Sequence, residues 1–156
     1  NPLNPKKEVD HLSTSFQTSS GVRPLHLSPQ ARPMTVPQVF RAAARLLVVN
    51  GLWKGDFCPD PRDRYVKTPH AERPLSIVAA LMCVTTGDPH MGSKLADEAI
   101  VVLAMRLEVD GEAPDADLGR PWMAMHVDEW GDFEGRTAES AVAVLEAAAD
   151  ASEVSV

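Results

Sequence analysis

Residues 74–86 of the chain read PLSIVAALMCVTT, a run without a charged side chain. Its only polar residues are Ser76, Thr85 and Thr86. A helix that is apolar on every side has no stripe that can face water, so its stable place is inside the protein. Pro74 suits the first turn of such a helix, and Gly87 suits its end. The run therefore predicts a buried central helix around which the other elements pack.

Three further segments have apolar residues at helical spacing. They are residues 36–50, a segment from Ser93 to about Asp110, and one from Thr137 to about Asp150. Each is preceded or opened by a residue that can cap a helix, and these residues are Thr35, Ser93 and Thr137. The sequence therefore predicts a mainly α protein, a small orthogonal four-helix domain around a buried central helix.

The start of the chain lacks the composition of a packed core. Residues 1–34 hold five prolines and a cluster of serines and threonines, and such a segment buries too little apolar surface to offset its ordering entropy. We therefore predict an irregular, flexible Pro/Ser-rich arm at 1–34, a helical domain at 35–150 and a frayed tail at 151–156. Apolar residues in the arm could anchor it on its own domain or on a second chain.

A long polar loop is expected between the first and the central helix. Residues 54–73 read KGDFCPDPRDRYVKTPHAER, which is rich in Pro and Asp. A loop of this length is unusual within a small domain and is either a functional lid or a loosely ordered excursion. It is therefore the first place to look for a site. A second, acidic loop is expected at 111–121.

The formal charge of −7 is unevenly distributed along the chain. Residues 95–156 carry three basic and fifteen acidic side chains, whereas the preceding part has an excess of basic ones. The acidic part would repel a phosphate backbone, so the composition disfavours nucleic-acid binding. The same part could meet a basic partner, or could be no more than a solvated surface.

Cysteine content and hydropathy bear on the cellular compartment. Cys58 and Cys83 are too few for a disulfide framework, and Cys83 lies within the apolar central run. No stretch approaches the roughly 20 apolar residues of a membrane span, and we identify no secretory signal. We expect a cytoplasmic protein that does not interact with membranes.

Three short motifs carry a resemblance. Residues 51–55 read GLWKG, residues 79–81 read AAL, and residues 130–137 read WGDFEGRT. Together they resemble an uncharacterised actinobacterial family, a domain of unknown function whose members typically show G-W-x-x-G, a small-residue run and W-N-D-x-x-G-R-T. Leu52 displaces the first Trp by one position, and Gly131 replaces the Asn. The resemblance covers about residues 36–149 and implies a fold, but no activity, cofactor or catalytic residue.

The last motif has two interpretations. In the structural one, Thr137 caps the final helix, Asp132 pairs with Arg136, and Trp130 anchors the segment to the core. In the functional one, Asp132 and Arg136 recognise a polar ligand or partner beside Trp130. The candidate ligand- or partner-binding residues are Trp53, Trp130, Asp132, Arg136 and His126.

Patterns for catalysis and metal binding are weak. His126, Asp128 and Glu129 form H-x-D-E, whose side chains suit a metal but whose spacing arises by chance in an acidic segment. Cys58 and His70 could form a nucleophilic pair, but no third orienting group is marked. Gly-rich phosphate loops, G-x-S-x-G and dinucleotide fingerprints are absent from the sequence. We therefore predict no catalytic residue, metal or cofactor.

These observations favour a non-enzymatic protein-binding or accessory module. Its partner would be another protein or a second copy of the chain, engaged through the N-terminal arm or the loop at 54–73. The alternative is a small enzyme or ligand-binding protein that uses the region of Trp53, Trp130, Asp132 and Arg136.

Overall fold

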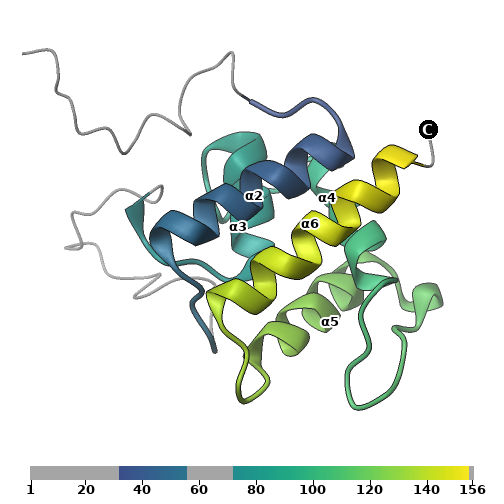
Figure 1. Ribbon diagram of the computed structural model, residues 1–156. Helices are drawn as coiled ribbons and strands as arrows, with labels where there is room; N and C mark the ends of the chain where they lie inside the picture. Colours follow the sequence, from purple (N-terminus) through teal and green to yellow (C-terminus); the bar gives the residue numbers. More distant parts are fainter. Residues whose placement is uncertain (1–31, 56–71, 155–156) are drawn as a thin grey trace, which may run out of the picture.

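The computed structural model describes residues 32–55 and 72–154 of the chain (Figure 1). This part contains five α-helices and one 3-10 turn, and its only β pairing is two isolated bridges. The elements are α2 (Val36–Asn50), α3 (Ile77–Thr86), α4 (Lys94–Ala104), η5 (Ala116–Leu118), α5 (Arg120–Asp132) and α6 (Ala138–Val154). The predicted mainly α class is thus confirmed. None of the described helices is both long and apolar enough to cross a membrane.

α3 is the buried centre of the fold, as its uncharged composition predicts. The five residues from Ile77 to Leu81 are fully buried, and α3 contacts α2, α4 and α5. The helix begins at Ile77, three residues later than predicted. Leu75 is instead extended and forms a bridge with Leu52, and the Ser76 hydroxyl caps the helix by accepting from the Ala79 N–H at 3.1 Å.

The helix starts predicted from the capping residues agree with the structure, but the predicted end of the third helix near Asp110 is wrong, because α4 ends at Ala104. The hydroxyls of Thr35, Ser93 and Thr137 each accept a hydrogen bond from the backbone N–H three residues further on. Gly87 ends α3 with a φ of 88°, a left-handed conformation that glycine adopts without steric cost. α6 continues to Val154, beyond the predicted boundary near Asp150.

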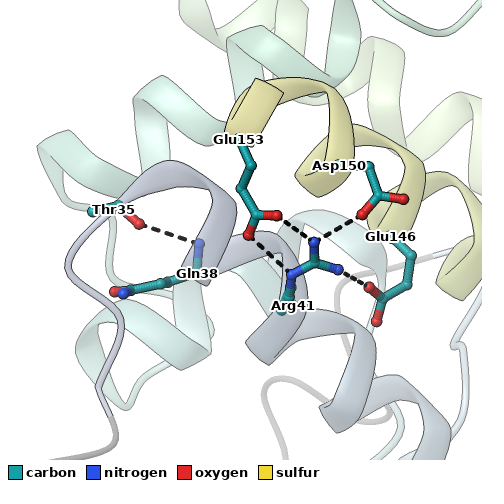
Figure 2. Close-up of polar contacts among 6 residues, drawn as sticks. All are labelled: Thr35, Gln38, Arg41, Glu146, Asp150 and Glu153. Atoms are coloured by element: carbon teal, nitrogen blue, oxygen red, sulfur yellow. Dashed lines mark hydrogen bonds and ion pairs between the residues drawn. The ribbon is translucent and has the colours of Figure 1, made fainter. Parts of the chain in front are cut away.

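α2 and α6 pack side by side and form one layer of the domain (Figure 1). Arg41 of α2 links the two helices through ion pairs (Figure 2). Its guanidinium contacts Glu146, Asp150 at 2.8 Å and Glu153 at 2.7 Å, all on α6. The hydrogen bonds to Glu153 and Asp150 raise the pKa of Arg41 further above its ordinary value. One cation shared by three carboxylates leaves this surface of α6 acidic.

α5 is a helix that the apolar spacing did not reveal. It has large apolar residues on two opposite sides, so its sequence lacks the single stripe that marks an amphipathic helix. Its N-cap is Gly119, which has no side chain with which to signal a helix start. The fold therefore has one helix more than the four-helix domain predicted. α5 lies along the lower edge of the fold in Figure 1.

Candidate functional site

α5 and the turn that follows it carry four of the five residues singled out in the sequence. These are His126, Trp130, Asp132 and Arg136, and the fifth, Trp53, lies in the segment after α2. The buried side of α5 consists of Met123, His126, Val127, Trp130 and Gly131. Gly131 brings α5 close to α3, because a Cβ at this position would lie 3.4 Å from Cδ1 of Ile77.

The histidine and the carboxylates of the H-x-D-E segment lie on different sides of α5. Nε2 of the buried His126 lies 2.7 Å from the carbonyl oxygen of Leu107, so this imidazole connects α5 to the beginning of the loop after α4. Asp128 contacts the start of α3, and Glu129 is exposed to solvent. Within residues 32–55 and 72–154, no three potential metal-ligating side chains lie together. The H-x-D-E spacing is therefore explained by packing.

Asp128 has an unusual electrostatic environment for a carboxyl group. Its Oδ1 accepts a hydrogen bond from the Val78 N–H at 3.1 Å, in the first turn of α3. Loss of hydration raises the pKa of Asp128 to about 7, and the charge of Asp132 acts in the same direction. The hydrogen bonds from Val78 and Ser76 act in the opposite direction. This carboxyl group therefore changes its charge near neutral pH.

The segment after α2 meets the C-terminal end of α5. The Asp132 carboxylate accepts from the Gly55 N–H at 2.9 Å. The Lys54 ammonium donates to the carbonyl oxygen of Phe133 at 2.8 Å and to that of Arg136 at 3.3 Å. These contacts join two of the quoted motifs, residues 51–55 and 130–137, at the corner between α5 and α6. We call this region the α5 corner.

Arg136 completes the α5 corner by folding back over the helix. Its guanidinium carbon lies 3.7 Å from the centroid of the Trp130 ring, and its Nε donates to the Trp130 carbonyl oxygen at 2.9 Å. Arg136 and Lys54 thus place two cations at the C-terminal end of α5, where the helix dipole favours positive charge. The predicted pair of Asp132 with Arg136 is wrong, because Asp132 binds Gly55 and Arg136 binds Trp130 instead.

Trp53 lies beside the α5 corner without a side-chain contact that assigns it a role. Its N–H donates to the Leu75 carbonyl oxygen at 2.9 Å, so its backbone belongs to the short extended pairing before α3. Its side chain is 37% exposed. Cys58 and His70, the other pair considered for chemistry, lie outside the described residues, as do most of the N-terminal arm and most of the loop at 54–73.

The side of α5 that faces away from the core is exposed and partly apolar. Trp122 is 52% exposed and Met125 is 46% exposed, and helical spacing places Glu129 on the same side one turn later. We call these three residues the α5 outer face. Leu118 and Phe133, just before and just after α5, are exposed large apolar residues as well. This surface was not predicted from the sequence, although apolar residues at helical spacing on two sides of residues 120–132 were a signal for it.

Comparison with known proteins identifies a family whose function is unknown. A family model described as a family of unknown function (DUF6197) matches residues 31–151. The match begins just before α2, includes α5 and the segments that contact it, and ends within α6. No curated protein and no solved structure matches the chain.

Proposed function

The chain belongs to DUF6197, a family of unknown function, and we propose that this protein is a non-enzymatic protein-binding module that docks through the α5 outer face. One observation carries the proposal: Trp122 and Met125 are half exposed on a helix whose opposite side is packed into the core. Aromatic residues and Met are enriched at protein interfaces, where their burial contributes much of the binding energy.

The contacts of α5 support a binding surface that is already ordered before a partner arrives. His126, Asp128 and Asp132 each contact a backbone group of another segment, so α5 is held near its middle and at its end. A rigid surface loses little conformational entropy on binding. The candidate residues at the α5 corner thus have a structural role in the proposal, and the contact with a partner is made by Trp122 and Met125.

The length of α5 suggests the size of the partner surface. Thirteen residues span about 20 Å, which matches a helix or a peptide better than the broad face of a large domain. Leu118 and Phe133 extend the apolar surface at the two ends of α5. This proposal places the docking surface on the described helix and not on the arm or the loop at 54–73.

One observation favours the alternative, a small enzyme or ligand-binding protein. The pKa of Asp128 near 7 would suit a group that transfers a proton. However, the carboxylates of Asp128 and Asp132 accept from the N–H groups of Val78 and Gly55, and Arg136 donates to the Trp130 carbonyl oxygen. A ligand would have to replace these contacts, which favours the structural role.

A capture experiment with matched variants tests the proposed function. The double variant Trp122→Ser/Met125→Ser removes the apolar part of the α5 outer face, and Val48→Ser/Met91→Ser removes two other exposed apolar side chains as a control. Cross-linking and affinity capture with the full chain should retain a partner with wild type and control but not with the Trp122/Met125 variant. Thermal unfolding should confirm that both variants fold. Equal retention by all three proteins, or no specific partner for wild type, would contradict the proposal.

A further inference from the structure

We propose that the partner of the α5 outer face is a basic amphipathic helix, with apolar side chains on one side flanked by Lys or Arg. This inference rests on the proposed function and adds the chemistry of the partner. It combines two features of the same surface: the exposed apolar pair Trp122 and Met125, and the negative charge around it.

The negative charge lies at the edges of the apolar pair. Asp115 and Asp117 are exposed directly before α5, Glu129 is on the α5 outer face itself, and Glu134 is exposed just after the helix. The whole segment 95–156 has fifteen acidic and three basic residues. A partner with the same apolar surface and acidic flanks would therefore be repelled, whereas basic flanks would be attracted.

The basic residues at the two ends of α5 are already engaged by the protein. Arg120, in the first turn, donates from Nε to Oδ2 of Asp97 at 2.9 Å. Arg136 is stacked over Trp130 at the other end. Neither guanidinium forms an ion pair with Asp117 or Glu129. In the described part of the chain, no other basic side chain forms an ion pair with these two carboxylates either. A partner can therefore contribute the matching positive charges.

The shape of the surface favours a helix as the partner. Trp122 and Met125 are three residues apart, so they form a short ridge on a straight helix. A second helix with apolar residues at positions i and i+3 or i+4 can pack against such a ridge, and its remaining positions can carry Lys or Arg. A second copy of this chain using the same face would place the acidic residues of one copy, Asp117 and Glu129, near those of the other. Charge complementarity thus favours a different, basic partner.

Selection from a random peptide display library on the whole chain of 156 residues tests this chemistry directly. We expect the enriched peptides to be basic and to carry apolar residues at helical spacing. For a labelled enriched peptide, fluorescence anisotropy should show at least a tenfold loss of affinity with Trp122→Ser/Met125→Ser. Asp117→Asn/Glu129→Gln should weaken binding about threefold to tenfold, and added salt should reduce this difference.

The charge control uses two carboxylates on another surface. Asp150→Asn/Glu153→Gln removes the same net charge from the side of α6 that contacts Arg41 of α2 (Figure 2). If the negative charge acts locally, this control should change peptide affinity less than Asp117→Asn/Glu129→Gln does. An equal effect of the two variants would show that overall charge, and not the edge of the α5 outer face, attracts the peptide.

The outcomes separate this inference from the proposed function. Enriched peptides that depend on Trp122 and Met125 but are neutral or acidic would overturn the basic partner and leave the binding surface intact. If the peptides bind wild type and the Trp122/Met125 variant equally, or if wild type enriches no peptides beyond those enriched by that variant, both the basic partner and the binding surface are overturned. Sedimentation that shows a dimer of wild type, lost in the Trp122/Met125 variant, would make a second copy the occupant and overturn the basic partner.

Discussion

Replacing Asp128 with Asn should change how the stability of the protein depends on pH. The half-buried carboxyl group has a pKa of about 7 in the folded protein, against an ordinary value of 3.8, chiefly because it has lost hydration. A raised pKa means that the folded state binds the proton more tightly than the unfolded state does. The contribution of Asp128 to stability is therefore greatest below about pH 4, falls as the pH rises, and levels off above about pH 7.

The size of the effect follows from the pKa change. A full shift from 3.8 to about 7 would correspond to roughly 4 kcal/mol of unfolding free energy. Because the side chain is only half-buried, water screens part of this cost, and we expect about 1–3 kcal/mol. An Asn side chain has almost the same shape, and its oxygen can still accept from the Val78 N–H. Asp128→Asn should therefore be closest to wild type below about pH 4, gain on it as the pH rises, and be more stable by that amount at about pH 8.

Urea unfolding of wild type and Asp128→Asn at several pH values between about 3.5 and about 8.5, a range that contains both pKa values, measures this difference. Other titrating groups cancel in the comparison because both proteins share them. Glu98→Gln, which removes one charge from an exposed position on α4, is the control and should show no such pH-dependent gain. A stability difference between Asp128→Asn and wild type that is the same at pH 5 and pH 8 would refute the assigned environment.

Three further substitutions test an ion-pair cluster, a close helix contact and a helix cap elsewhere in the fold. Arg41→Met should lower the midpoint of thermal unfolding because three carboxylates of α6 lose their shared cation, and the decrease should be smaller in high salt. Calorimetry at two salt concentrations measures this decrease, and an unchanged midpoint would contradict the role of the cluster. Gly131→Val should lower the free energy of unfolding in urea by about 1–3 kcal/mol because the valine methyl groups would press on Ile77, whereas Gly131→Ala should be tolerated. Equal effects of the two substitutions would show that α5 and α3 are not closely packed there. Ser76→Ala should cost about 1 kcal/mol through loss of the α3 cap, and no cost would argue against that cap.

The helix ends show which structural signals were present in the sequence. The caps at Thr35, Ser93 and Thr137 were predicted because each involves a hydrogen bond to a residue only three positions away. The buried position of α3 was predicted because a helix without polar residues on any side has no stable place in water. Its start was misplaced because the pairing of Leu75 with Leu52 joins residues 23 positions apart.

The candidate site was predicted only as a group of residues, and not as a geometry. Trp53 was grouped with Trp130, Asp132 and Arg136 from the sequence, and the contacts of Lys54 and Gly55 bring the segment after α2 to the α5 corner. The partners within the group were wrong for Asp132 and Arg136, because backbone groups that come near only in the folded chain compete for these side chains.

The sequence by itself determined the helical class, the buried central segment and the capped helix ends, since these depend on side chains within a few positions of each other. Only the tertiary structure decided that α5 is a helix with one side packed and the other exposed. Apolar residues occur on both sides of α5, and the chain's own pattern does not say which side the core will cover. The packing of Gly131 on Ile77 and the hydrogen bond of Asp128 to α3 make that choice, and they leave Trp122 and Met125 facing water.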